Sequence, residues 1–176
     1  MKKLVIPILM AVLAIAACSS EKADTALKTG AERTGEYLPL LEGKKVAVVA
    51  NQTSMVGNSH LVDTLLSSGI DVKMIFAPEH GFRDLADAGA VITSGADPVT
   101  GINVVSLYGA KKKPAPEDLA GVDIVIFDIQ DVGTRFYTYL TTMCYVMEAC
   151  AENGKPFIVM DRPNPNGYYV DGPILD

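Results

Sequence analysis

Short, uninterrupted apolar runs recur along this chain and are separated by stretches with helical spacing. Five runs, rich in valine and isoleucine, lie at residues 46–50, 72–77, 103–107, 123–128 and 157–161. Runs of this length and composition are typical of parallel strands that helices cover on both faces. The alternation of strand and crossover therefore predicts an α/β fold, with a doubly wound, mostly parallel, Rossmann-like sheet and helices on both faces.

The clearest helical pattern lies between the last two runs. Apolar residues at spacings of three and four predict one stripe that faces the sheet, made of Phe136, Tyr139, Leu140, Met143, Val146, Met147 and Cys150. Gly154 ends this helix, and Pro156 prevents its continuation. Cys144 and Cys150 would lie about 9 Å apart along the helix axis, too far for a disulfide, so both are expected to be buried free thiols.

The amino terminus has the features of an export signal. Two lysines precede 14 apolar residues that end at Ala17, a stretch shorter than the roughly 20 residues that span a bilayer. The small residues before Cys18 resemble the lipobox of bacterial lipoproteins, in which the chain is cut before a diacylated cysteine. An ordinary signal peptide with an incidental cysteine is the alternative.

These features divide the chain into three parts. We expect a lipoprotein signal peptide at 1–17, a flexible tether at 18–37 after the lipidated Cys18, and the folded domain at 38–176. The protein is then an exported bacterial lipoprotein, anchored to the cell envelope at the outer membrane or another periplasm-facing membrane.

Composition and motifs argue against several classes of function. Acidic residues outnumber basic ones by 21 to 15, and residues 111–113 form the only basic run, so nothing favours nucleic acid as a partner. The turn at 51–55 lacks the glycines of a dinucleotide site, and no phosphate-binding loop or serine nucleophile elbow is present. The two histidines are His60, expected to begin a surface helix, and His80, so neither a metal nor a cofactor is expected.

Polar residues follow each of the five runs at the point where the strand would leave the sheet. In open α/β sheets the ligand crevice lies outside the carboxyl ends of the strands, so these side chains are expected to meet at one rim. Carboxylates with amide and guanidinium neighbours suit sugar recognition and acid/base chemistry at a glycosidic bond. The predicted rim residues are Asn51, Gln52, Glu79, His80, Arg83, Tyr108, Asp128, Gln130, Asp131, Arg135, Tyr137, Asp161, Arg162 and Asn164.

Three of these residues are arginines, and two roles are open to each of them. Arg83, Arg135 and Arg162 could hold a substrate carboxylate through a bidentate fork. Alternatively, each could form a salt bridge within the loops, to Asp84, Asp131 or Asp161.

Six segments of the chain occur together, and in order, as they do in the NamZ-type exo-β-N-acetylmuramidases. The chain resembles this family from about residue 38 to its last residue. The resemblance implies a glycoside hydrolase that releases N-acetylmuramic acid from the non-reducing end of peptidoglycan fragments during cell-wall turnover or scavenging. The segments are Asn51-Gln52-Thr53, Pro78-Glu79-His80-Gly81, Ser106-Leu107-Tyr108-Gly109, 127–133, 135–139 and 161–165.

The resemblance also implies a Rossmann-like catalytic domain followed by a smaller C-terminal domain. The sequence stops shortly after the fifth run, so we expect an incomplete catalytic domain and no second domain. The activity of the chain by itself is therefore open. The alternatives are an envelope lipoprotein that binds a wall-derived sugar or muropeptide without cleaving it, and an inactive fragment.

The family assigns the role of catalytic acid to the glutamate of its Pro-Glu-His-Gly motif, which corresponds to Glu79. A surface carboxylate that caps the next turn is the alternative for this residue. His80 would orient Glu79 or touch the sugar. Asp131 and Asp128 are the two candidates for a second carboxylate; we place Asp131 in the catalytic group and Asp128 among the substrate-binding residues.

The remaining rim residues are expected to bind the substrate. Amide side chains would bind hydroxyl or acetamido groups, a tyrosine would offer an aromatic platform, and the arginines would meet the lactyl carboxylate of muramic acid. The amides are Asn51, Gln52, Gln130 and Asn164, the tyrosines are Tyr108 and Tyr137, and Asp161 completes the set.

Overall fold

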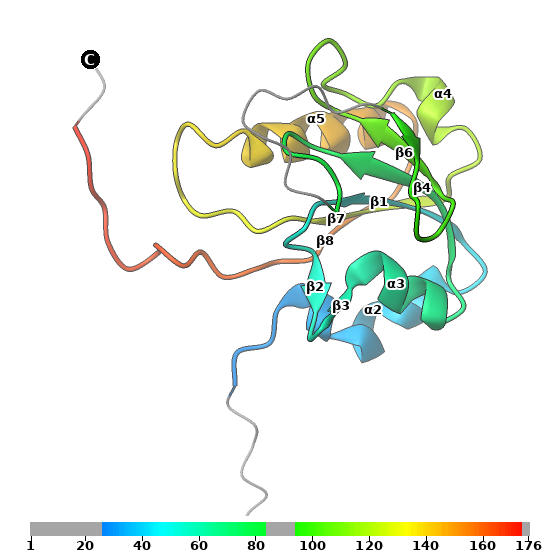
Figure 1. Ribbon diagram of the computed structural model, residues 1–176, viewed down its shortest axis with the longest axis horizontal. Coiled ribbons are helices and arrows are strands. Elements are labelled where there is room, and N and C mark those ends of the chain that lie inside the picture. Colours follow the sequence, from blue (N-terminus) through cyan, green and yellow to red (C-terminus); the bar gives the residue numbers. More distant parts are fainter. Residues whose placement is uncertain (1–25, 84–93, 174–176) are drawn as a thin grey trace, which may run out of the picture.

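A six-stranded sheet between two layers of helices forms the body of the protein in the computed structural model, which describes residues 26–83 and 94–173 (Figure 1). The predicted signal peptide, Cys18 and the start of the predicted tether lie outside these ranges. The parallel strands are β1 (Lys45–Ala50), β4 (Asp71–Ala77), β6 (Asn103–Ser106), β7 (Ile124–Asp128) and β8 (Phe157–Val159).

The order of the strands creates one reversal point in the sheet. The order is β5-β6-β4-β1-β7-β8, with β5 (Gly95–Ala96) antiparallel to β6. The chain therefore moves outward from β1 through β4 and β6, then returns to the other side of β1 for β7 and β8. Ligands in such sheets bind where the order reverses, at the carboxyl ends of the two central strands. Those ends point to the left in Figure 1, where the loops after β7 and β8 leave the sheet.

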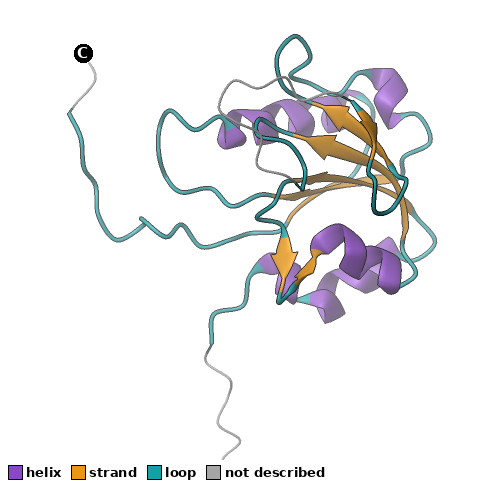
Figure 2. Ribbon diagram, in the orientation of Figure 1, coloured by secondary structure: helices purple, strands orange, loops and turns teal. Residues whose placement is uncertain are grey.

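Helices cover both faces of the sheet, as predicted (Figure 2). One face carries α2 (Thr34–Leu41) and α3 (Leu61–Ser67), and the other carries α4 (Pro116–Leu119) and α5 (Tyr139–Glu152). Within residues 26–83 and 94–173, no helix has the length and apolar character needed to cross a membrane.

The central strand supplies both apolar cores because its side chains alternate between the two faces. Val46, Val48 and Ala50 pack with α2 and α3, while Ala47 and Val49 pack with α4 and α5. All five are fully buried, which explains why the run is continuously apolar rather than alternating. The α/β class and the mostly parallel sheet predicted from sequence are thus confirmed.

The predicted stripe on α5 is only partly correct. Phe136 precedes the helix and is 83% exposed, and Leu140 and Met147 are also exposed. The predicted Tyr139, Val146 and Cys150 are buried, and the apolar pattern overlooked two smaller residues on the same buried face, Thr142 and Ala149. Both remaining cysteines are free as predicted, but Cys144 is exposed rather than buried.

Two features lie where the sequence predicted none. The 3-10 helix η1 (Gly30–Glu32) and the first half of α2 fall within the predicted tether. The Tyr37 hydroxyl of α2 donates a hydrogen bond of 2.9 Å to the Ala31 carbonyl of η1, which ties the two elements together. A short hairpin of β2 (Met55–Val56) and β3 (Ser59–His60) precedes α3. Elements this short carry too few residues for periodicity to register.

Candidate active site at the carboxyl edge of the sheet

Hydrogen bonds join the loops after β1 and β7 at the reversal point. Asn51 follows β1 and is fully buried, and its Oδ1 accepts from the Thr53 amide at 2.9 Å and the Thr53 hydroxyl at 2.6 Å. The Thr53 Oγ1 in turn accepts from the Gln130 amide at 3.0 Å. The Ser54 hydroxyl donates to the Asp128 carbonyl. The turn after β1 is therefore held rigidly against the end of β7.

A buried ion pair between Asp128 and Arg162 ties the end of β7 to the loop after β8. The Arg162 Nε lies 2.6 Å from Asp128 Oδ1, and its Nη2 lies 2.9 Å from Oδ2. Asp128 is fully buried; burial raises its pKa and the guanidinium opposes the rise. Arg162 also donates to the Met55 carbonyl at 2.9 Å, so it braces three loops at once. The structure thus places two predicted substrate-binding residues against each other.

Glu79 lies at the end of β4 with two hydroxyl groups directed at its carboxylate. Its side chain is half-buried, and Oε2 accepts a hydrogen bond of 3.0 Å from the Thr138 hydroxyl. The Tyr108 phenol, from the loop after β6, lies beside the same carboxylate, and this contact raises the pKa of Tyr108. Glu79 therefore receives partners from two other loops of the carboxyl edge.

The backbone turns sharply directly after Glu79. His80 has a φ of 72°, in the left-handed region that residues other than glycine rarely adopt. Backbone conformations of this kind cost free energy and cluster at active sites and ligand clamps. Because of this turn, the chain after His80 runs in a different direction from the Glu79 side chain.

The structure does not bring Arg83 toward Glu79. Its guanidinium contacts Asp63 of α3 at 2.6 and 2.9 Å and Asp97 at 3.1 Å. The Asp97 side chain is 1% exposed and also accepts from Thr100, so its pKa is lowered despite its burial. The salt-bridge alternative therefore describes Arg83, with Asp63 and Asp97 as its partners.

His60 is a buried residue at this edge that the sequence predicted only as the start of a surface helix. It does begin α3: its Nδ1 accepts from the Val62 amide at 3.2 Å, so Nε2 carries the proton and donates to the Asn51 carbonyl at 2.9 Å. Its ring also packs edge-on against Phe82 at 4.8 Å. Burial lowers the pKa of His60, which keeps the ring neutral.

The loops after β7 and β8 brace one another beside this site. The Gln130 amide nitrogen donates to the Asp131 carbonyl at 2.6 Å and to the Pro163 carbonyl at 2.9 Å. Asp131 is half-buried, and its Oδ2 accepts from the Gly133 amide at 3.0 Å. Asn164 lies against Gly133, and its Oδ1 accepts from the Asn166 amide at 2.9 Å.

The other predicted residues differ in their exposure and in the contacts that they make with the rest of the protein. Arg135, Tyr137 and Asp161 are exposed, and no ion pair involves Arg135 among the described residues. Asn51 Nδ2 faces the Tyr139 hydroxyl without forming a regular hydrogen bond, and Gln52 Oε1 is buried with no partner in the described parts of the chain. Buried polar groups without a hydrogen-bond partner are uncommon in folded proteins.

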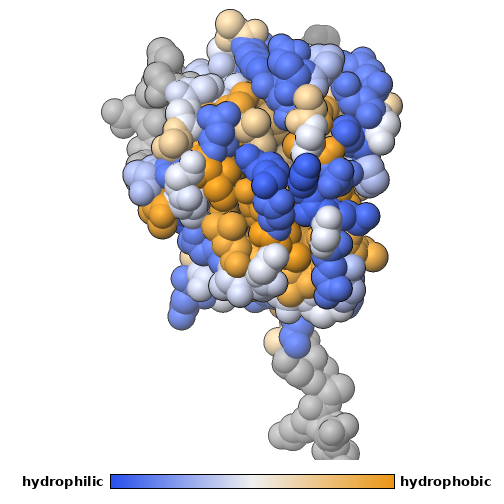
Figure 3. Space-filling model, turned by 90° about the vertical axis from the view of Figure 1, so that its right-hand side faces the viewer, coloured by the Kyte–Doolittle hydropathy of each residue, from blue (hydrophilic) through white to orange (hydrophobic). Residues whose placement is uncertain are grey.

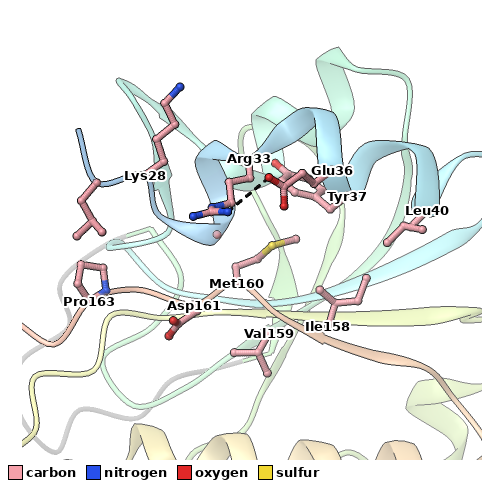
Figure 4. A pocket seen from close by; sticks show the side chains of 12 residues that line it. Lys28, Arg33, Glu36, Tyr37, Leu40, Ile158, Val159, Met160, Asp161 and Pro163 are labelled. Atoms are coloured by element: carbon pink, nitrogen blue, oxygen red, sulfur yellow. Dashed lines mark hydrogen bonds and ion pairs between the residues drawn. The ribbon is translucent and has the colours of Figure 1, made fainter. Parts of the chain in front are cut away.

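Glu79 lines neither of the two cavities described next. A cavity of about 480 Å³ lies beside β8, between that strand and α2, and Asp161 is the one predicted residue among its lining (Figure 4). Arg33 and Glu36 form an ion pair of 3.5 Å at its rim. A smaller cavity of about 150 Å³ is lined by Asp131, Asp161 and Arg162.

The opposite side of the molecule, at the amino ends of the strands, presents apolar patches among hydrophilic residues (Figure 3). The predicted rim residues follow the carboxyl ends and so belong to the other side. Within the described ranges, no group of three or more His, Cys, Asp or Glu side chains could hold a metal ion. The carboxyl edge supplies carboxylates, amides and hydroxyls, which suit proton transfer and the binding of a polyhydroxylated ligand.

The chain is similar to a curated protein and to two solved structures. The chain is 49% identical over 144 residues to "Peptidoglycan beta-N-acetylmuramidase NamZ" of Bacillus subtilis (strain 168), which covers 80% of this chain and 35% of that protein. Two DUF1343 family crystal structures from Bacteroides fragilis NCTC 9343 match with TM-scores of 0.70 at 49% and 42% identity; they cover 84% and 78% of this chain.

The chain spans only a little over a third of the length of these relatives. The matched region covers 38% and 35% of the chains in the two crystal structures. A family model described as "Exo-beta-N-acetylmuramidase NamZ, N-terminal" matches residues 46–176, which include every predicted rim residue. The chain belongs to the NamZ N-terminal family.

Proposed function

We propose that this chain forms the acid/base half of an exo-acting glycosidase that releases N-acetylmuramic acid from the non-reducing end of peptidoglycan fragments. Membership of the NamZ family and the 49% identity to a peptidoglycan β-N-acetylmuramidase support the reaction and the substrate. The observation that carries the proposal is the position of Glu79, at the carboxyl edge of the sheet with hydroxyl groups around its carboxylate.

In this proposal Glu79 protonates the glycosidic oxygen as the bond to the leaving sugar breaks. A second carboxylate then manages the attacking water or the positive charge that develops on the sugar ring. Asp131 suits this role better than Asp128, because Asp128 is fully buried and held by Arg162. His80, in its left-handed conformation, sets the direction in which Glu79 points.

The lactyl carboxylate of muramic acid needs a cationic partner, and Arg135 is the rim arginine that suits it. Arg83 and Arg162 are each held by carboxylates of the protein. Arg135 is exposed in the loop between β7 and α5, two positions before Tyr137, which is 47% exposed and available as an aromatic platform. The half-buried amide of Gln52 then binds hydroxyl or acetamido groups, whereas Asn51 is fully buried and held by Thr53.

Product analysis tests this function directly. Muramic-acid-terminated wall fragments are incubated with the chain, and with a chimera in which the remaining part of the Bacillus subtilis relative follows residue 176. We expect release of N-acetylmuramic acid from the non-reducing end by at least the chimera, detected by mass spectrometry. Saturable binding by calorimetry without release supports a binding protein instead, and inactivity of both proteins overturns the proposal.

We further propose export and lipid attachment at Cys18, for which the support is the sequence alone. An apolar stretch of 14 residues and small residues precede this cysteine. Lipid chains contribute about 0.8 kcal/mol per buried methylene, so two or three would hold the domain at a membrane. Cys18→Ser is expected to abolish incorporation of a labelled fatty acid and to release the protein from the membrane fraction; unchanged labelling would contradict the proposal.

A further inference from the structure

The threonine that begins α5 does not use its side chain to cap the helix. Thr138 occupies the N-cap position, where threonine usually accepts a hydrogen bond from the first turn, yet its side chain makes no such bond. Its hydroxyl donates instead to Glu79 Oε2, 59 residues away, at 3.0 Å. The Thr138 carbonyl still begins the helix by accepting from the Thr142 amide at 2.9 Å. The Thr138 hydroxyl therefore does not cap the helix that it begins.

A second hydroxyl reaches the same carboxylate from a different part of the sheet. Tyr108 follows β6, the neighbour of β4, and its phenol lies beside the Glu79 carboxylate. The hydrogen bond from Thr138 and the contact with Tyr108 together restrict the rotation of this carboxylate. The first turn of α5 also presents backbone amides toward this end of the helix, where negative charge is favoured.

We infer that Tyr108 and Thr138 are positioning residues for Glu79 and that they set the orientation from which it transfers its proton. This inference rests on the proposed glycosidase function. It also assigns Tyr108 a polar task in addition to the predicted one, because the hydroxyl, rather than the ring face, meets Glu79. Neither residue needs to touch the substrate.

Tyr108→Phe and Thr138→Val each remove one hydroxyl and keep the shape of the side chain. We expect each to lower kcat by about tenfold, the size expected for the loss of one hydrogen bond to a charged group, with KM little changed. Thr138→Ser retains the hydroxyl and should restore most of the activity. Tyr145→Phe and Thr141→Val, at exposed positions on α5, are the matched controls and should leave kcat unchanged.

A double-mutant cycle separates positioning from a general loss of structure. In a Glu79→Ala background, measured on a substrate with a good leaving group, Tyr108→Phe and Thr138→Val should lower the residual rate by less than about twofold, because their partner is absent. Unchanged kcat in the single variants, or equal losses with and without Glu79, would overturn the inference. If the wild-type protein is active, either result leaves the proposed function standing.

A spectroscopic measurement tests the Tyr108 contact without any turnover. The contact with Glu79 raises the pKa of the Tyr108 phenol, so Glu79→Ala should let Tyr108 ionise at lower pH. The carbon-13 resonance of the phenol carbon, followed against pH, reports this change. An ionisation of Tyr108 that is the same in wild type and Glu79→Ala would refute the positioning contact, whatever the outcome of the activity assays.

Discussion

At the scale of single residues, His60 connects the loop after β1, the start of α3 and the loop after β4. Its Nε2 holds the Asn51 carbonyl, its Nδ1 caps α3, and its ring packs against Phe82, three residues after Glu79. The contact with the Val62 amide requires a neutral ring with the proton on Nε2, because a proton on Nδ1 would face that amide, which is itself a donor.

This requirement predicts a loss of stability in mild acid. Burial lowers the pKa of His60 in the folded protein, so the unfolded chain takes up a proton first, near its ordinary pKa of about 6.5. The contribution of His60 is thus complete above that pH and declines as the pH falls through it toward the lowered folded value. Urea unfolding midpoints at pH 7.5, 6.5 and 5.5 should fall for the wild type.

His60→Asn provides the control, because asparagine still caps a helix but does not titrate in this range. The variant is expected to be less stable at every pH and to show a flatter dependence between pH 7.5 and 5.5. Parallel dependences for the two proteins would show that His60 does not contribute to acid sensitivity.

A second residue-level prediction concerns recognition of the lactyl carboxylate. Arg135→Gln should raise KM for muramic-acid substrates by about tenfold and leave kcat nearly unchanged, because the lost contact binds ground state and transition state alike. Substrates that end in N-acetylglucosamine lack the lactyl group and should show no such change. Arg33→Gln, outside the proposed site, is the control; an equal effect of Arg135→Gln on both substrates would contradict the role.

At the scale of elements, the sequence predicted the strands and helices that are long enough to show an apolar pattern. The apolar runs located the five parallel strands to within about two residues at each end, since burial against helices leaves few polar residues inside them; Lys73 in β4 is an exposed exception. The buried face of α5 was only partly predictable, because Thr142 and Ala149 do not register as apolar anchors. β5 was missed because two residues, Gly95 and Ala96, carry no strand signal.

The loops after β7 and β8 act as one unit, and Gly133 tests their contact. Gly133 has a φ of 70°, and a Cβ added there would lie 3.0 Å from Asn164 Cγ and closer to Nδ2. Gly43 has nearly the same φ of 69° with no atom within 4 Å of such a Cβ. Alanine at either position should cost about 1–2 kcal/mol of stability because of its backbone conformation.

The difference between the two variants isolates the contact with Asn164. Gly133→Ala should also displace the loop that carries Asp131 and lower kcat, whereas Gly43→Ala should keep the wild-type rate. Chemical denaturation and steady-state kinetics on both variants measure these effects. Equal activity of the two would mean that the packing of Gly133 on Asn164 does not position the site.

At the scale of the whole molecule, the predicted convergence on one edge of the sheet could be derived from topology. A parallel sheet brings every carboxyl strand end to the same side, so the rim residues had to follow one edge. Their pairings could not be derived, because Arg162 with Asp128 and Arg83 with Asp63 join residues 34 and 20 positions apart. The residues next to each partner in the sequence do not predict such contacts.

These pairings divide the predicted rim into two groups with different tasks. Asp128, Arg162 and Arg83 hold the loops in place through buried or half-buried ion pairs. Glu79, Asp131 and Arg135 are left with the more accessible side chains. The chemistry is thus carried by the second group on a scaffold that the first group fixes, and Glu79 is central to it.

The leaving-group dependence of Glu79→Gln tests that role most directly. A general acid matters most when the leaving group is a poor one, so the variant should lower kcat on a muramic-acid disaccharide by about 10²–10⁴-fold and much less on a 4-nitrophenyl muramide. Glu42→Gln, beyond the end of α2, should match the wild type on both substrates. An equal loss on the two substrates, or no loss on the disaccharide, would contradict the assignment of Glu79 as the acid.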